Sequence, residues 1–125
     1  MSEVWGIILA AGGSVRMGAR KMLLPYHGKT IIEKVIENVL ASGIGRVVVV
    51  TGSGSDEILK VISRLPVETC FNKNWKEGML SSVKCGFRFL PEKCKAVLIF
   101  LGDQPMIDAE TIQEVIYAYR KSGKG

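Results

Sequence analysis

Three short runs of the sequence are apolar throughout and lack the alternation of polar and apolar side chains that a half-exposed strand shows. They cover residues 4–9, 47–50 and 96–101, and a weaker run with a proline and a glutamate, expected nearer a sheet edge, covers residues 66–71. Strands without alternation are buried on both faces, as in parallel sheets. Segments with helical spacing of apolar residues separate these runs, and this order of elements predicts crossover connections. The pattern therefore predicts a three-layer α/β fold, with a mainly parallel sheet between helices.

Four helices are expected between and after these strands. Thr30 and Glu33 form a T-x-x-E capping box before the first helix, Gly43 is a typical residue just past its end, and Asp108 can cap the last helix. The other three helices are predicted over residues 55–64, 79–90 and 109–121. Apolar spacing predicts inward-facing side chains in the last two: Leu80, Val83, Phe87 and Leu90, and then Ile112, Val115, Ile116 and Tyr119.

Length and charge limit the classes of protein to which the chain can belong. Its 125 residues favour a single domain over residues 1–125, and we find no internal repeat or linker. The net charge of +5 fits either a mildly basic surface or an anionic substrate, because cations are concentrated within residues 16–29. We expect no nucleic-acid partner, since the sequence has no basic helix and no basic patch interleaved with aromatic residues.

The cysteines and the apolar segments bear on where the protein works. Cys70, Cys85 and Cys94 are widely spaced and form no C-x-x-C pair, so we expect neither a zinc site nor a disulfide framework. Reduced thiols in a cytoplasmic protein are the simplest interpretation. The N-terminal apolar run lacks a basic segment before it, so no signal peptide is predicted. No apolar run approaches transmembrane length, and we expect no membrane partner.

The strongest functional signal is a glycine-rich, basic stretch at residues 9–24, directly after the first predicted strand. It reads L-A-A-G-G-S-V-R-M-G-A-R-K-M-L-L, with three glycines and three cations interleaved. Glycine lets main-chain N–H groups approach a ligand closely, and successive N–H groups form a concavity that binds anions. A phosphate group is therefore the expected ligand, although the stretch matches neither the Walker loop G-x-x-x-x-G-K-[ST] nor the dinucleotide fingerprint G-x-G-x-x-G.

A second loop, G-D-Q-P at residues 102–105, follows the fourth predicted strand. Doubly wound sheets bind ligands beyond the carboxyl ends of their strands, at the point where the strand order reverses. If the order of the predicted strands is 3-2-1-4, the two loops flank this point. Asp103 would then be placed to hold Mg²⁺, which prefers oxygen ligands and often shares substrate phosphates. The alternative is a turn residue or a helix cap.

A third segment, residues 74–82, has Gly78 followed by serines at the start of a predicted helix. Free N–H groups and hydroxyls at such a position can bind an anion. The alternative is an ordinary helix start, with Met79 and Leu80 in the core. His27, the only histidine, lies in a segment typical of a surface turn, which makes a catalytic role unexpected.

The three segments together resemble those of the MobA-like nucleotidyltransferases. Residues 9–25 are similar to the family signature A-A-G-x-S-x-R-M-G-x-x-K-x-L-L-P. The patterns G-M-x-x-S, from Gly78, and L-G-D-Q-P-M, over residues 101–106, resemble those of molybdenum cofactor cytidylyltransferases. The resemblance implies a Rossmann-like sheet of the nucleotide-diphospho-sugar transferase type, with Mg²⁺ as cofactor. It also implies transfer of CMP from CTP to a molybdopterin-type acceptor, with release of pyrophosphate.

The resemblance also implies roles for individual residues. Triphosphate binding is assigned to Gly12, Gly13, Ser14, Arg16 and Lys21. The catalytic group consists of Lys21, Arg16 and Asp103, of which Asp103 would hold the metal. Contacts with the base and the ribose are assigned to Leu9, Ala10, Ala11, Gly78, Met79 and Ser82. Guanylyl-transferring relatives typically have glycine at the position of Ala11, which favours a cytidylyl group here.

The chain is shorter than the members of this family, whose second half supplies the acceptor pocket and typically another metal-binding aspartate. We therefore expect a C-terminally truncated nucleotide-binding half, either a fragment or a minimal protein that needs a partner. Among enzymes, the alternatives are guanylyl transfer and transfer to a sugar phosphate or to methylerythritol phosphate. The alternative from another class is a non-catalytic nucleotide-binding accessory in molybdoenzyme maturation. The expected partners are CTP or another NTP and a molybdopterin-type acceptor, with a molybdoenzyme as a further candidate.

Overall fold

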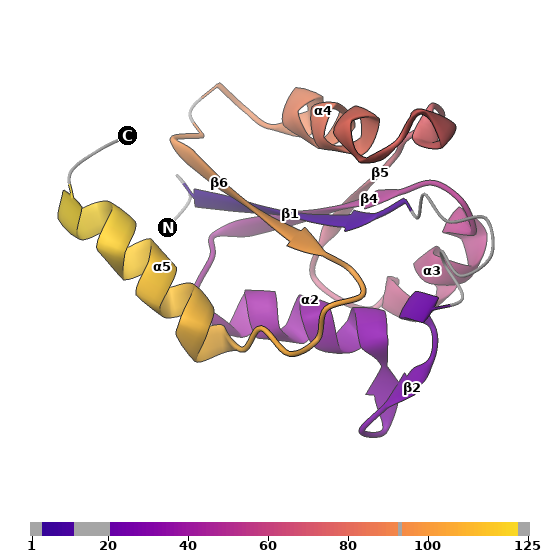
Figure 1. The fold of residues 1–125 in the computed structure, drawn as a ribbon, viewed down its shortest axis with the longest axis horizontal. Helices are drawn as coiled ribbons and strands as arrows, with labels where there is room; N and C mark the ends of the chain where they lie inside the picture. The colour runs from indigo at the N-terminus through magenta and orange to yellow at the C-terminus, as the bar shows by residue number, and fades with distance from the viewer. Residues whose placement is uncertain (1–3, 12–20, 93, 123–125) are drawn as a thin grey trace.

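The computed structural model describes residues 4–11, 21–92 and 94–122 of the chain. Its main sheet has four parallel strands in the order β5-β4-β1-β6 (Figure 1). These strands are β1 (Val4–Ala10), β4 (Arg46–Thr51), β5 (Glu68–Phe71) and β6 (Ala96–Leu101). A small antiparallel hairpin is formed by β2 (Pro25–Tyr26) and β3 (Lys29–Thr30). The parallel sheet and the 3-2-1-4 order considered from the sequence are confirmed, and β5 lies at an edge as expected.

Within the described residues, the helices of eight or more residues are those that the apolar spacing predicts, with ends within two residues of the expected ones. They are α2 (Ile31–Ala41), α3 (Ser55–Ile62), α4 (Met79–Phe89) and α5 (Ala109–Ser122), and a short 3₁₀ helix, η1 (Trp75–Glu77), precedes α4. None of the helices in the described part of the chain is long and apolar enough to cross a membrane.

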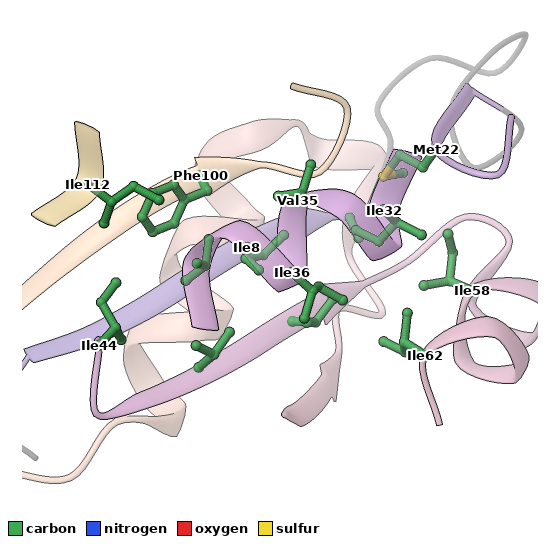
Figure 2. Packing of buried hydrophobic residues seen from close by; sticks show 14 of the residues in the cluster. Ile8, Met22, Ile32, Val35, Ile36, Ile44, Ile58, Ile62, Phe100 and Ile112 are labelled. Carbon is green, nitrogen blue, oxygen red and sulfur yellow. The ribbon is translucent and has the colours of Figure 1, made fainter. Parts of the chain in front are cut away.

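The central strands β1 and β4 are buried on both faces, which explains their unbroken apolar sequences. Ile8 and Val49 belong to a core shared with α2, α3 and α5, shown in Figure 2. Ile7 and Val50 point to the opposite face and belong to a second core, against which side chains of α4 pack. Figure 1 shows the resulting layers, with α4 on one face of the sheet and α2 on the other. Burying each such side chain contributes about 1.5–3 kcal/mol.

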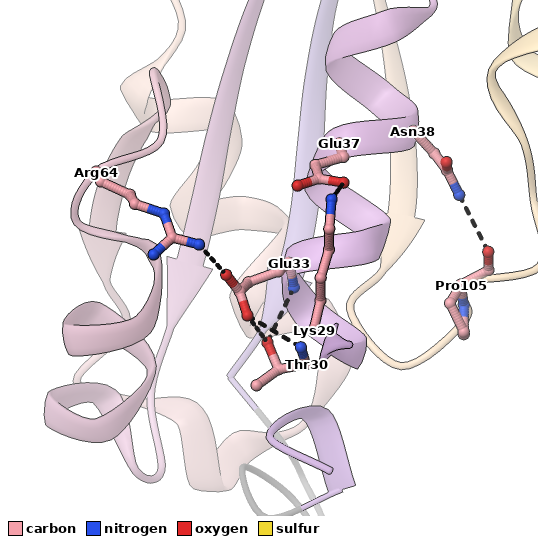
Figure 3. Close-up of polar contacts among 7 residues, drawn as sticks. All are labelled: Lys29, Thr30, Glu33, Glu37, Asn38, Arg64 and Pro105. Atoms are coloured by element: carbon pink, nitrogen blue, oxygen red, sulfur yellow. Dashed lines mark hydrogen bonds and ion pairs between the residues drawn. The ribbon is translucent and has the colours of Figure 1, made fainter. Parts of the chain in front are cut away.

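The start of α2 is fixed by the predicted capping box. The Glu33 N–H donates to Thr30 Oγ1 at 3.3 Å, and the Thr30 N–H donates to Glu33 Oε1 at 2.9 Å (Figure 3). Arg64, just after α3, donates to Glu33 Oε2 at 2.7 Å and so ties the two helices together. The Thr30 N–H bond is the largest cause that holds the pKa of Glu33 below its ordinary value of 4.5, and the Arg64 and Lys29 cations lower it further.

Replacing Glu33 by Ala is expected to destabilise the fold by about 1–2 kcal/mol, because it removes the reciprocal cap and the Arg64 pair. Glu33→Gln keeps the cap, so it should destabilise the fold less than Glu33→Ala does. A carboxyl with a lowered pKa contributes stability above its unfolded pKa, and this contribution is lost as the pH falls through the folded pKa. Urea unfolding should therefore show a difference in the free energy of unfolding between the wild type and Glu33→Gln at pH 7. This difference should shrink as the pH falls below 4.5. A difference in the free energy of unfolding that stays constant with pH would contradict the lowered pKa of Glu33.

The inward face of α4 differs from the predicted one. Leu80 and Phe87 were expected in the core but are 65% and 49% exposed, whereas Ser82 and Gly86 are buried. The reason is the close approach of the helix to the sheet. A Cβ at Gly86 would lie 3.0 Å from two carbons of Ile7, so the position that touches the sheet has no room for a large side chain. Apolar spacing alone favoured Phe87, the bulkier residue that follows Gly86, as the buried one.

Two further side chains lie outside the core against expectation. Val115 of α5 is 48% exposed, although Ile112 and Ile116 of the same helix are buried. In β6 only Phe100 is buried and Ile99 is 45% exposed, because β6 is an edge strand in the described part of the chain. The apolar run at residues 96–101 therefore correctly predicted a strand, but its burial on both faces was wrong.

Candidate functional site

Parallel strands bring their carboxyl ends to the same edge of the sheet, and the predicted site segments lie there. Ala11 follows β1 and Gly102 follows β6, and these strands are neighbours. The Gly102 N–H donates to the Leu9 carbonyl at 3.0 Å, so the two strands stay paired to their ends. The chain runs from β1 outward to β4 and β5 and then returns to the other side of β1 with β6. The strand order therefore reverses between β1 and β6, where ligands of such sheets bind.

Lys21 and Asp103 meet at this reversal point. Lys21 Nζ lies 3.5 Å from Asp103 Oδ2, and the two side chains are 51% and 37% exposed. Met22, directly after Lys21, is buried in the core beside α2 and anchors this segment. The structure thus brings together the cation and the carboxylate that the sequence assigned to triphosphate and metal, and both remain accessible to a ligand.

Four other predicted residues, Gly12, Gly13, Ser14 and Arg16, lie outside the described residues. Their assigned part in triphosphate binding stays a prediction. The stretch that contains them begins after Ala11 and ends before Lys21, so it connects the end of β1 to the lysine of the ion pair.

Leu9, Ala10 and Ala11 are all buried, which limits how they could contact a base or ribose. The side chains of Leu9 and Ala10 point into the two cores, one on each face of the sheet. The Ala11 carbonyl accepts the Ser53 N–H at 3.0 Å, and the Leu9 carbonyl is engaged by Gly102. Any nucleotide contact made by Leu9 or Ala10 must therefore use the main chain.

The turn before α4 is the third predicted segment. Gly78 has φ +104°, a conformation that side-chain-bearing residues rarely adopt, and it leads directly into the helix. Met79 is 59% exposed, so the expected alternative of a core position for it is wrong. Ser82 is only 3% exposed and its hydroxyl accepts a hydrogen bond from within the protein. The structure thus leaves Met79 exposed and buries Ser82 in this turn, and the contacts with base and ribose assigned to Gly78, Met79 and Ser82 stay predictions.

Asn72, which the sequence reasoning missed, holds this turn in place from the end of β5. It is 4% exposed, and its Nδ2 donates to Ser81 Oγ at 2.9 Å and to Ser82 Oγ at 3.0 Å. Its Oδ1 accepts the Asn74 N–H at 3.0 Å, and its own N–H donates to the Thr51 carbonyl at 2.7 Å. A polar residue directly after a strand was the available signal, but its partners depend on the fold.

Asn38 has a similar function for the loop that carries Asp103. Its Nδ2 donates to the carbonyls of Pro105 and Ile107 at 3.0 and 3.1 Å, and Figure 3 shows the first of these bonds. This amide fixes the loop after β6 to the side of α2. An asparagine inside a helix is unfavourable by propensity and was the sequence signal for a special role.

Replacing Asn72 by Ala is expected to destabilise the protein by about 1–2 kcal/mol, because buried hydroxyl and amide groups lose their partners. The turn at Gly78 should also loosen, so nucleotide affinity should fall several-fold. Denaturant unfolding and calorimetric titration measure the two effects. Asn74→Ala is the matched control, since Asn74 joins this network through its main chain. Equal effects of the two substitutions would contradict the assigned role of Asn72.

The strand order, with the Lys21–Asp103 pair at its reversal point, defines the chain as a doubly wound α/β protein. The sequence matches the profile of the MobA-like NTP transferase domain over residues 6–125, and the chain belongs to this family of nucleotidyltransferases.

Two curated relatives illustrate the similarity. The chain is 33% identical over 118 residues to nicotine blue oxidoreductase of Paenarthrobacter nicotinovorans, a match covering 94% of this chain and 57% of that protein. It is 38% identical over 120 residues to the bifunctional protein GlmU of Clostridium botulinum, with 94% of this chain and 26% of that protein covered. The chain therefore spans only part of the length of the relatives that it matches.

Solved structures share the fold. A nucleotidyl transferase from Methanothermobacter superposes with a TM-score of 0.81 at 26% identity, covering 92% of this chain and 57% of the other. Rv0371c of Mycobacterium tuberculosis, solved in complex with manganese, superposes with a TM-score of 0.79 at 19% identity, covering 93% and 59%. A protein of this fold thus binds a divalent metal.

Proposed function

We propose that residues 1–125 form the nucleotide-binding domain of a molybdenum cofactor cytidylyltransferase, which transfers CMP from CTP to a molybdopterin-type acceptor and releases pyrophosphate. The observation that carries the proposal is the Lys21–Asp103 pair at the reversal point of the sheet. The family membership supports nucleotidyl transfer. The cytidylyl group and the acceptor rest on the sequences L-A-A-G, G-M-L-S-S and L-G-D-Q-P-M.

The proposed reaction needs charge stabilisation more than acid–base catalysis. A phosphate oxygen of the acceptor attacks the α-phosphorus of CTP, a new P–O bond forms, and the bond to the β-phosphate breaks. Negative charge then builds up on the phosphate oxygens and on the leaving pyrophosphate. Lys21, half exposed at the end of the glycine-rich stretch, can turn from Asp103 to these oxygens, and Arg16 is assigned the same task.

Asp103 fits a magnesium ion shared with substrate phosphates. In the described part of the chain, no three His, Cys, Asp or Glu side chains are grouped to hold a metal, so Asp103 would act without such a cluster. Mg²⁺ commonly binds through one or two carboxylates together with phosphates and water, which matches this donor set. When bound, Mg²⁺ would neutralise charge on the phosphate oxygens.

Calorimetric titration of CTP, GTP and ATP in the presence of Mg²⁺ tests the nucleotide assignment. We expect CTP to bind most tightly, because the L-A-A-G sequence at residues 9–12 resembles that of cytidylyl-transferring proteins. Equal or tighter binding of GTP would contradict the cytidylyl group but not nucleotidyl transfer.

A second candidate is an oxidoreductase, favoured by the 33% identity to a protein of that name. Oxidation and reduction of a substrate require no cleavage of a nucleoside triphosphate. Pyrophosphate release from CTP that depends on a molybdopterin-type acceptor would therefore support the transferase. In a chain that also contains the acceptor half, or with a supplied partner, no release with any of the three nucleotides would favour the oxidoreductase or the non-catalytic accessory protein.

A further inference from the structure

Two cysteine thiols face each other between the sheet and the helix that covers it. Cys70 lies in the edge strand β5 and Cys85 in α4, and their Sγ atoms are 3.6 Å apart. Cys85 Sγ also lies 3.8 Å from the Phe71 carbonyl, to which it donates. Both residues are partly buried, with the pair at the margin of the core under α4 and not inside it.

The position of this pair favours reaction with a small reagent. A disulfide bond is about 2.05 Å long, so the two sulfurs need to approach each other by roughly 1.5 Å. Neither cysteine is fully buried, so a small molecule can reach the pair. The third cysteine differs, because Cys94 Sγ donates to the Ala96 carbonyl at 3.3 Å and has no thiol partner among the described residues.

We propose that Cys70 and Cys85 are a reversible dithiol–disulfide pair, which a small-molecule disulfide closes into a covalent link between β5 and α4. In the first step the Cys85 sulfur attacks the reagent, a mixed disulfide forms, and one thiolate leaves. In the second step the Cys70 sulfur attacks the Cys85 sulfur and displaces the second thiolate. The two cysteines are oxidised, the reagent is reduced to two thiols, and the two cysteine protons pass to the leaving thiolates.

The order of these steps follows from the surroundings of Cys70. Burial, and after it the hydrogen bond and charge of Cys85, raise the pKa of the Cys70 thiol to about 12. Since the thiolate is the attacking form, the raised pKa disfavours Cys70 as the first attacker and leaves the first attack to Cys85. Once Cys85 is in the mixed disulfide, its thiol no longer raises the pKa of Cys70, although burial, the larger cause, remains. The second attack is therefore favoured chiefly by the proximity of the two sulfurs.

Oxidised glutathione, applied to the folded 125-residue chain at low protein concentration, tests the proposal. Thiol titration should fall from three groups to one, and the intact mass should decrease by two hydrogen atoms. Peptide mapping should place the bond between residues 70 and 85, and dithiothreitol should reverse it. The closed loop should raise the melting temperature by about 5 °C or more. Cys94→Ser is the matched control and should still lose both of its remaining thiols.

Several results would overturn the proposal. These are three unreacted thiols, separate glutathione adducts on Cys70 and Cys85, a bond to Cys94, and a disulfide between two chains. A melting temperature that falls or does not change on oxidation would also do so, because the bond would then form only with distortion of the native packing. Cys70→Ser and Cys85→Ser should each retain a glutathione adduct or free thiols and form no internal bond.

Discussion

Asp103→Asn is expected to reduce Mg²⁺-dependent pyrophosphate release by about a hundredfold or more, the usual range for loss of a group that stabilises transition-state charge. The asparagine keeps the shape of the side chain and one acceptor oxygen but removes the negative charge that would hold the metal. Metal-free nucleotide binding should persist or tighten slightly, because Lys21 loses its anionic partner. Pyrophosphate release is measured with a chain that contains the acceptor half, or with a supplied partner, in the presence of the molybdopterin-type acceptor. Calorimetric titration with and without Mg²⁺ measures nucleotide binding separately.

The fold should tolerate this change. The Lys21–Asp103 pair is substantially exposed, and such pairs contribute only about 0–1 kcal/mol to stability. Asp108→Asn is the matched control in the same loop, since Asp108 caps α5 through the Thr111 N–H at 2.9 Å and asparagine caps equally well. If Asp103→Asn turned over like the wild type, Asp103 would be a turn residue and the metal assignment would be wrong.

The architecture could be predicted because its determinants are local in the sequence. The unbroken apolar runs of β1 and β4 predict strands buried on both faces, and the two cores confirm this. The capping box of Thr30 and Glu33 and the cap at Asp108 fixed the starts of two helices to within one residue. The strand order 3-2-1-4 was the condition under which the two loops flank the reversal point, and the observed strand pairings confirm that order.

Which helix face is buried could not be predicted as well. Apolar spacing in α4 placed Phe87 in the core, but the structure buries Gly86 there, because the helix lies too close to Ile7 for a larger residue. The distance between a helix and a sheet is set by the whole packing arrangement and leaves no periodic signal. The exposure of Ile99 could not be predicted either, because the sequence of an apolar strand does not show whether the strand lies at the centre or at the edge of a sheet. In the described part of the chain, β6 lies at an edge.

The candidate site shows the same division. Lys21 and Asp103 were assigned from motifs and the structure brings them together, whereas their roles toward phosphate and metal stay predictions. The supporting residues Asn38 and Asn72 were missed, since their partners are carbonyls and hydroxyls that only the fold brings near. Both hold a loop that carries predicted site residues, so the site depends on contacts that no short motif contains.

Gly52→Ala is expected to destabilise the protein by about 2–3 kcal/mol, because overpacking of rigid neighbours has costs of this size. A Cβ at Gly52 would lie 2.6 Å from Trp75 Cβ and 3.0 Å from Ala11 Cβ. Both contacts are to atoms fixed next to the main chain, so no flexible side chain can yield. Either η1 or the end of β1 must therefore move, and each adjoins a segment assigned to the nucleotide. Urea unfolding should show the loss of stability, and titration should show weaker CTP binding.

A double-mutant cycle separates this clash from any other effect of an added methyl group. Trp75→Gly removes the two atoms nearest to the added Cβ, which are Trp75 Cβ and Cγ. In that background, Gly52→Ala should lower the free energy of unfolding clearly less than it does in the wild type. The coupling should be of the order of 1–2 kcal/mol, within the range measured for residues in contact. If the effects of the two substitutions on the free energy of unfolding were additive, Trp75 would not be in close contact with residue 52. The close packing of Trp75 against Gly52, which follows β4, would then be wrong.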